Sequence, residues 1–159
     1  SGGRVVFMSS VNGRVSFPVF GPYCGSKFAL EAVADALRME LVPWNIAVVI
    51  VEPAQTDTDM WRTAGTFAEE TAAAMPPEAQ QLYQRHIVGL KKSIPKSQKM
   101  AVPAEKVAAV VETALTARRP RARYIVGMGP KAQLALINRL PSRSRDRLLR
   151  ALGSQPGRP

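Results

Sequence analysis

The sequence predicts an α/β fold, built on a doubly wound parallel sheet with three visible strands and flanking helices. Residues 4–9, "RVVFMS", and 46–51, "IAVVIV", are short continuous apolar runs, which are typical of strands covered on both faces of a sheet. Amphipathic helical segments follow these strands, and parallel strands need such crossover connections. A sheet of only three strands should leave an edge strand unpaired.

The first strand leads into a helix through a turn and a loop. Asn12-Gly13 marks the turn, and residues 14–22 contain two prolines and a glycine, as loops do. Residues 23–42 have a helical period, and Pro43 ends this helix because the residue before a proline avoids the helical conformation. The apolar stripe of the helix consists of Phe28, Leu30, Val33, Ala34, Leu37 and Leu41.

The segment that follows the second strand is less regular. Residues 58–101 contain alanine-rich helical pieces, a break at Pro76-Pro77 and a basic stretch, "KKSIPKSQK". We expect one or two helices here, within a mobile excursion from the sheet.

The last part of the chain resumes the alternation. Residues 103–118 begin with a proline and have amphipathic helical spacing. Residues 122–128, "ARYIVGM", are predicted as the third strand, and two short basic helices should follow at about 130–140 and 143–152. We expect the residues beyond 152 to fray.

The net charge of +10 belongs to the C-terminal quarter of the chain. Residues 1–117 hold 11 basic and 11 acidic side chains, whereas residues 118–159 hold 11 basic side chains against Asp146 alone. Such a patch can bind phosphates, acidic proteins or an anionic membrane surface. The plainer interpretation, which we favour, is a solvated basic face.

The composition excludes several classes of site. One cysteine, Cys24, cannot form an internal disulfide, so we expect a cytoplasmic protein. With one histidine, His86, far from that cysteine, no metal site is expected. The basic stretch "ARRPRAR" lacks interleaved aromatic residues, so we expect no nucleic-acid partner.

The stretch "YCGSK" carries the chemistry that the sequence suggests. Tyr23 and Lys27 are four residues apart at the start of a helix and therefore lie on one face, one turn apart. An ammonium group beside a phenol favours its ionised form, and such a tyrosine can exchange a proton with an alcohol or carbonyl oxygen. Ser10, at the end of the preceding strand, could hold the same oxygen. A hydride would have to come from a cofactor.

These segments, "VVFMSSVNGR", "YCGSKFALEAVADALRMEL" and "IAVVIVEPAQTDT", closely resemble the C-terminal half of the short-chain dehydrogenases/reductases. The resemblance covers residues 3–60 strongly and 103–128 more loosely. It implies a Rossmann-like sheet and an NAD(P)-dependent oxidoreductase that interconverts an alcohol and a carbonyl. The catalytic residues of the family fall on Ser10, Tyr23 and Lys27.

The same resemblance implies a nicotinamide cofactor, either NAD or NADP. The positions expected to bind it are Tyr23, Lys27, Pro53, Ala54, Thr56 and Thr58. Ala54 stands where the family usually has a glycine, which should shift this loop slightly.

Residues 58–101 correspond to the substrate lid of the family, and Ser10, Met60 and Trp61 are expected to contact the substrate. Apolar residues of this segment suggest a steroid-like, retinoid-like or lipid-like substrate: Met60, Trp61, Phe67, Met75, Leu82 and Tyr83. The helix at 23–42 often packs across a dimer interface in this family, which implies a homo-oligomer.

The glycine-rich cofactor turn of the family is missing from this sequence. We therefore interpret residues 1–128 as a partial catalytic domain of a longer enzyme and residues 129–159 as a basic helical extension. We expect the isolated chain to bind little cofactor. Two alternatives stay open. The chain could be a non-catalytic module for oligomerisation or interaction. Residues 130–152 could also attach the protein to an anionic membrane surface.

Overall fold

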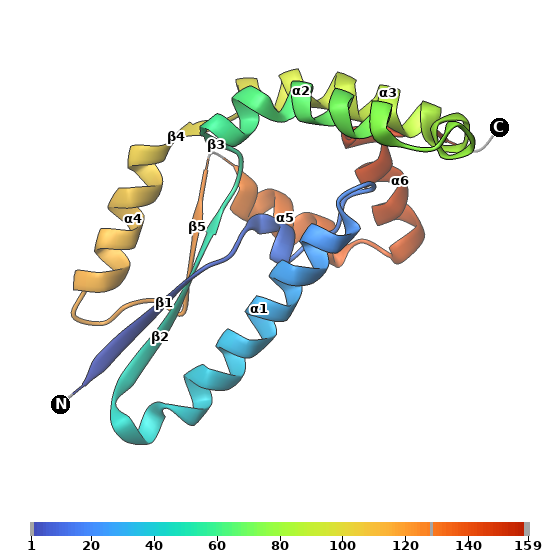
Figure 1. Cartoon of the computed structure of the whole chain (residues 1–159). Helices are drawn as coiled ribbons and strands as arrows, with labels where there is room; N and C mark the ends of the chain where they lie inside the picture. The colour runs from blue at the N-terminus through green and yellow to red at the C-terminus, as the bar shows by residue number, and fades with distance from the viewer. Residues whose placement is uncertain (1, 128, 158–159) are drawn as a thin grey trace.

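The computed structural model describes residues 2–127 and 129–157, without the side chains of residues 61, 62, 130 and 131. Its central element is a parallel sheet of three strands in the order β1 (Gly3–Met8), β2 (Ile46–Pro53) and β5 (Arg123–Val126). The prediction of an α/β fold with a parallel, Rossmann-like sheet is confirmed (Figure 1). Within the described residues, β1 and β5 are the edge strands of this sheet.

Helices cover both faces of the sheet, as the apolar strand runs predict (Figure 1). Successive side chains of a strand point to opposite faces. Val48 and Ile50 accordingly pack against α1 (Gly21–Glu40), whereas Val49 and Val51 pack against α4 (Ala104–Thr116). The residues that α1, α4 and the turn after α1 contribute to these two clusters are Ala34, Leu37, Leu41, Val107, Val110, Val111 and Ala114.

Helix α1 begins two residues earlier than the sequence predicts. Pro22 occupies its first turn, where the missing N–H of proline leaves no hydrogen bond unmade. Pro43 follows the last turn and lies in a short 3₁₀ helix, η2 (Val42–Trp44). Asn45 then adopts a left-handed conformation, with φ of 54°, and turns the chain into β2.

Residues 59–99 are more regular than predicted. They form two helices that pack on each other, α2 (Asp59–Ala74) and α3 (Pro77–Lys99), and the predicted break at Pro76 is confirmed. The basic stretch is not a loop, because α3 continues through it with Pro95 inside the helix. Proline removes one helical hydrogen bond, and the side chain of the neighbouring Ile94 is buried.

A second, two-stranded sheet was not predicted from the sequence. Its strands are β3 (Thr56–Asp57) and β4 (Val102–Pro103), which run parallel. Val102 donates its backbone N–H to the carbonyl oxygen of Gln55 at 2.9 Å. This pairing joins the two ends of the α2–α3 segment just beyond the carboxyl end of β2 (Figure 1).

The C-terminal part forms the two predicted helices, α5 (Pro130–Arg139) and α6 (Ser142–Leu152). Their apolar side chains are buried in a cluster with the loop that follows β1; its members are Val15, Leu134, Ile137 and Leu149. The expectation that the chain frays after residue 152 is wrong for residues 153–156. These are half-buried against α3, where the Gln155 side chain contacts that of His86 at 2.7 Å.

Candidate active site

Ser10 lies where the carboxyl ends of β1 and β2 meet. It caps a short 3₁₀ helix, η1 (Val11–Gly13), by accepting the backbone N–H of Asn12 at 3.1 Å. Its hydroxyl also lies within 3.4 Å of the Pro53 carbonyl oxygen, to which it donates. The side chain therefore links two strand ends that are 43 residues apart in sequence.

Tyr23 and Lys27 occupy the first two turns of α1, with the spacing that the sequence predicts. The Lys27 Nζ atom donates to the Met8 carbonyl oxygen at 3.0 Å and lies 5.9 Å from the centroid of the Tyr23 ring. Tyr23 is 43% exposed, so its ring stays accessible to a ligand. Lys27 thus attaches the start of α1 to the end of the strand that leads to Ser10.

The positions predicted to bind a cofactor follow directly on β2. The Ala54 N–H donates to the carbonyl oxygen of Val126 at 2.9 Å, which ties this turn to β5. Thr56 Oγ1 donates to the Ala54 carbonyl oxygen at 3.2 Å, and Thr58 Oγ1 to that of Thr56 at 3.4 Å. The turn therefore lies at the same sheet edge as Ser10, where ligands of parallel α/β sheets bind.

A groove with a volume of about 550 Å³ runs between this turn and α4. Thr56 and Thr58 line it together with apolar side chains that include Val107, Val111 and Leu115. Ser10, Tyr23 and Lys27 do not line this groove. Ser10 is therefore hydrogen-bonded to Pro53, and the Lys27 ammonium lies near the Tyr23 ring. Thr56 and Thr58 line a separate apolar groove.

Two residues of α2, Met60 and Trp61, are predicted to contact a substrate. Met60 lies in the first turn of α2 and is 65% exposed. The side chain of Trp61 lies outside the described residues. The roles of Ser10, Met60 and Trp61 toward a substrate stay a prediction.

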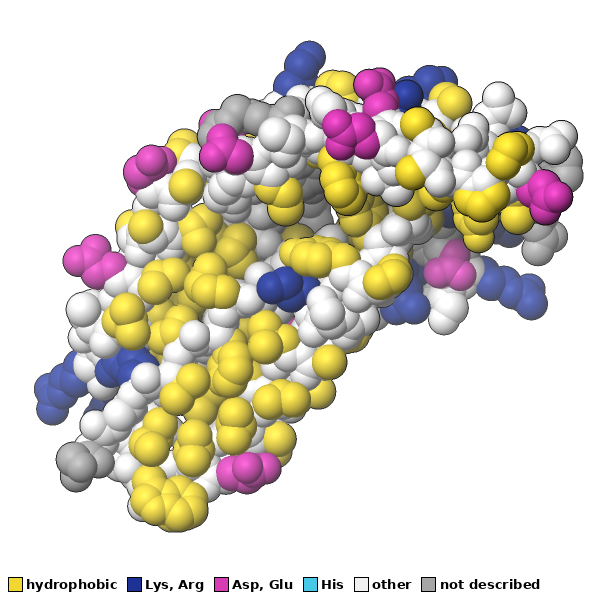
Figure 2. All heavy atoms as spheres, in the orientation of Figure 1, with side chains coloured by type: hydrophobic (Ala, Val, Ile, Leu, Met, Phe, Trp, Pro, Cys, Tyr) yellow, Lys and Arg dark blue, Asp and Glu magenta, His cyan; other side chains and the backbone are white. Residues whose placement is uncertain are grey.

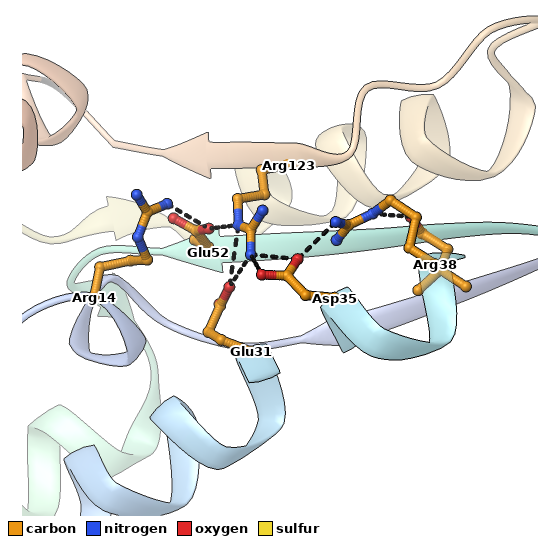
Figure 3. Close-up of polar contacts among 7 residues, drawn as sticks. Arg14, Glu31, Asp35, Arg38, Glu52 and Arg123 are labelled. Atoms are coloured by element: carbon orange, nitrogen blue, oxygen red, sulfur yellow. Dashed lines mark hydrogen bonds and ion pairs between the residues drawn. The ribbon is translucent and has the colours of Figure 1, made fainter. Parts of the chain in front are cut away.

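A charged network beneath this edge was missed by the sequence analysis (Figure 3). At its centre, Arg123 Nη2 donates to both carboxylate oxygens of Asp35 at 2.7 Å, and Nε lies 3.1 Å from Glu52 Oε1 and 3.2 Å from Glu31 Oε2. Arg14 lies 3.4 Å from Glu52 Oε1 at one end, and Arg38 Nη1 lies 2.6 Å from Asp35 Oδ1 at the other. The sequence does contain one indication of this network, because Glu52 is a charged residue in an otherwise apolar strand.

The network perturbs two of its carboxyl groups. Burial raises the pKa of Glu52 above its usual value, and the nearby charge of Glu31 acts in the same direction. The hydrogen bonds from Arg123 lower the pKa of Asp35, although desolvation opposes them. Arg123 thus favours the charged form of the more exposed acid, while the buried Glu52 binds its proton more tightly.

Close packing surrounds the same acids. A Cβ atom at Gly13 would lie 2.8 Å from Ser9 Oγ and 2.9 Å from Glu31 Cγ, so only glycine fits between them. Among the described residues, three buried oxygen atoms of this region have no hydrogen-bond partner: Ser9 Oγ, Glu31 Oε1 and Glu52 Oε2. The loop after β1 is therefore pressed against α1 at Glu31.

Neither a membrane-spanning helix nor a metal site is found among residues 2–127 and 129–157. No helix among them combines the length and the apolar character that crossing a membrane requires. No three of their histidine, cysteine, aspartate or glutamate side chains gather as a metal site would require.

The chain is similar in sequence and in fold to known dehydrogenases. Residues 1–69 match the family model described as short chain dehydrogenase. The chain is 32% identical over 146 residues to an NADPH-dependent 3-dehydrocapnine reductase of Ornithobacterium rhinotracheale, covering 92% of this chain and 49% of the relative. It is 35% identical over 161 residues to retinol dehydrogenase 5 of Mus musculus, covering 92% and 48%.

A solved structure agrees with these relatives. A short-chain dehydrogenase from Streptomyces avermitilis superposes with a TM-score of 0.60 at 25% identity, over 83% of this chain and 45% of that one. The family model, the relatives and the solved structure together support membership of the short-chain dehydrogenase family. The chain spans about half the length of the curated relatives it matches.

Proposed function

We propose that this chain supplies the catalytic serine, tyrosine and lysine of an NAD(P)-dependent oxidoreductase that interconverts an alcohol and a carbonyl. One observation carries the proposal. The Lys27 ammonium lies beside the Tyr23 ring and is held at the end of β1, two residues before Ser10. Ser10, Tyr23 and Lys27 therefore lie near the carboxyl end of β1 rather than in separate parts of the molecule.

Each of the three residues has a distinct task in the proposed reaction. Ser10 exchanges its 3.4 Å hydrogen bond to the Pro53 carbonyl oxygen for one to the reacting oxygen, which it holds in place. Tyr23 passes a proton to that oxygen in reduction and receives it in oxidation. Lys27 holds the start of α1 at the end of β1, with its ammonium 5.9 Å from the centre of the Tyr23 ring.

The residues present fit the nicotinamide end of a dinucleotide. Hydroxyl and backbone groups of Ala54, Thr56 and Thr58 lie just beyond a parallel strand, and the Lys27 ammonium has donors left after its bond to Met8. When bound, the nicotinamide would supply or accept the hydride. Tyr23, Lys27 and residues 53–58 would hold and orient it.

We further propose an apolar substrate. Two relatives are named as a retinol dehydrogenase and an 11-beta-hydroxysteroid dehydrogenase. In this chain, apolar side chains of α2 and α3 are exposed, among them Met60, Phe67 and Leu82. A steroid-like, retinoid-like or lipid-like alcohol could be covered by such a surface.

Replacing Tyr23 with phenylalanine tests the proposal in the full-length protein. The variant keeps the ring but loses the proton, so the turnover number should fall by about a hundredfold or more. Turnover is measured as the change in nicotinamide absorbance with a panel of apolar alcohols. Tyr124→Phe, whose hydroxyl accepts the backbone N–H of Arg121 and has no proposed role in the reaction, is the matched control and should retain activity. Equal activity of the Tyr23→Phe variant and the parent would refute the proposal.

A non-catalytic module for oligomerisation is the second candidate. The observation in its favour is that α1 exposes large apolar side chains, including Phe28, Val33 and Met39. A surface of this kind, repeated on a second copy, could form a symmetric helix-to-helix interface. In the enzyme, the same surface would serve a homo-oligomer.

We also propose that the basic C-terminal helices favour anionic surfaces, in a cytoplasmic protein. Arg139, Arg143 and Arg147 are exposed on α5 and α6. Because Leu134, Ile137 and Leu149 are buried in the protein, attraction would depend on charge rather than on insertion of an apolar stripe.

A further inference from the structure

One ridge of α1 joins the proposed catalytic groups to the charged network. Tyr23, Lys27, Glu31 and Asp35 follow one another at intervals of four residues, so each lies one turn from the next. Lys27 is bonded to the end of β1, whereas Glu31 and Asp35 are bonded to Arg123 at the start of β5. The ridge is thus attached to the sheet at successive points behind Tyr23.

Arg123 is the residue on which these attachments converge (Figure 3). Its guanidinium contacts the carboxyl groups of Glu31, Asp35 and Glu52 within 3.2 Å. The planar fork of arginine fixes the direction of each bond, which a lysine ammonium would not do. Glu52 immediately precedes Pro53, whose carbonyl oxygen accepts the hydrogen bond of Ser10.

The loop that carries Ser10 meets the same network from the other side. Gly13 packs between Ser9 and Glu31, and Arg14 reaches Glu52. A shift of Glu31 would therefore move the loop on one side and the helix ridge on the other.

We propose that Arg123 is a positioning residue, which fixes the α1 ridge carrying Tyr23 against the strand ends carrying Ser10 and Pro53. This inference rests on the proposed function. Arg123 acts through Glu31, Asp35 and Glu52 and need not touch the substrate or the cofactor. Nothing in the amino-acid spacing marks it, since it is one of many arginines in the C-terminal quarter.

The test uses the full-length protein and two variants that retain different parts of the network. Arg123→Lys keeps the positive charge but loses the planar fork, and Asp35→Asn removes the bidentate partner while leaving Glu31 and Glu52. Arg119→Lys, at an exposed arginine four residues away, is the matched control. Circular dichroism and thermal melting establish that each variant folds.

A positioning role predicts a particular kinetic pattern. Displacing a reacting group by even an ångström can lower the rate about a hundredfold, so kcat should fall by about tenfold to a hundredfold in both variants. KM for alcohol and cofactor should change by less than about threefold, because binding groups are untouched. The double variant should lose no more than Arg123→Lys alone, since both changes break the same linkage.

Each outcome decides the matter. Wild-type kcat in folded Arg123→Lys and Asp35→Asn variants, or a loss no larger than that of Arg119→Lys, overturns the inference. Failure of both variants to fold also counts against it, because Arg123 would then be required for folding rather than for positioning. Tyr23→Phe is measured in parallel: if it is fully active, the proposed function itself has failed, whereas an inactive Tyr23→Phe with an unaffected Arg123→Lys rejects the positioning role alone.

Discussion

Glu52 is the residue at which this fold departs most from what its strand would suggest. Its side chain is 0% exposed, and it occupies a position between apolar neighbours in β2. Isolated carboxylates are rarely buried, because the charged form loses its hydration. Arg14 and Arg123 offset part of that loss, but burial still raises the pKa of Glu52.

The raised pKa of Glu52 has a defined effect on stability. Between the unfolded pKa, near 4.5, and the higher folded pKa, the folded protein binds more protons than the unfolded chain. The contribution of Glu52 to the free energy of unfolding is therefore fully present below the unfolded value and declines as pH rises through the folded pKa.

Glu52→Gln should remove this pH dependence, because glutamine does not titrate. Relative to the parent protein, the variant should become progressively more stable as the pH is raised from 4 to 8, as measured by denaturant unfolding at a series of pH values. Glu112→Gln, at an exposed acid on α4, is the control. A stability difference between parent and Glu52→Gln that stays constant over the whole range would contradict the assignment.

Not every residue of the site was equally predictable. Tyr23 and Lys27 lie in one short helical stretch, so their spacing alone places them together. Ser10 and Pro53 are joined because two apolar strands pair in parallel, which the sequence also indicates. The Arg123 network was missed because its members come from four separate elements, and one-dimensional spacing carries no information about which of many arginines meets a buried acid.

At the scale of elements, the strand–helix order was predictable, and the α2–α3 region was predicted only in part. Apolar runs and proline positions identify β1, β2, α1 and α4 because their packing faces are regular. The last residues were expected to fray because chain termini usually do. The tail, residues 153–156, is instead held by contacts with α3, which local sequence cannot show.

The contacts between the tail and α3 should make alanine destabilising at Gly89, whereas at Gly65 in α2 it should be stabilising. In a helix, replacing glycine with alanine normally stabilises by up to about 1 kcal/mol. A Cβ atom at Gly65 in α2 would meet nothing within 4 Å, so Gly65→Ala should raise the melting temperature. A Cβ atom at Gly89 in α3 would overlap the Ser154 carbonyl oxygen and lie 2.9 Å from Gln155 Nε2.

Gly89→Ala should therefore displace the tail and cost about 1–3 kcal/mol, as overpacking does. Thermal melting of the two variants, with hydrogen exchange along α3, measures this difference. Equal stabilisation by both substitutions would show that residues 153–156 do not pack on α3.

At the scale of the whole molecule, apolar side chains gather on one surface. Figure 2 shows them over the region of β1 and α1, on the face seen in Figure 1. Exposed large apolar side chains of β1, α1 and the turn after α1 include Val5, Met8, Tyr23, Phe28, Val33, Met39, Val42 and Trp44. Exposed apolar patches often mark sites where a protein binds another surface.

If α1 forms the proposed homo-oligomer interface, a charge in its exposed middle should weaken association. Val33, which is 52% exposed, is a suitable position. Val33→Asp should shift the full-length protein to a smaller mass in light scattering, because an unpaired carboxylate would be buried in the interface. Leu82→Asp, at a leucine 75% exposed on α3, is the control. An unchanged mass for Val33→Asp places the interface elsewhere.

The common direction of β1, β2 and β5 also has a practical use. Because Ser10 and Pro53 terminate their strands at one rim, the "RRPR" bend that precedes β5 belongs to the opposite rim. A dye or a resin linkage attached within residues 118–121 would leave the rim that carries Ser10 and Pro53 open to solution. Ligand binding at that rim could then be assayed on immobilised molecules.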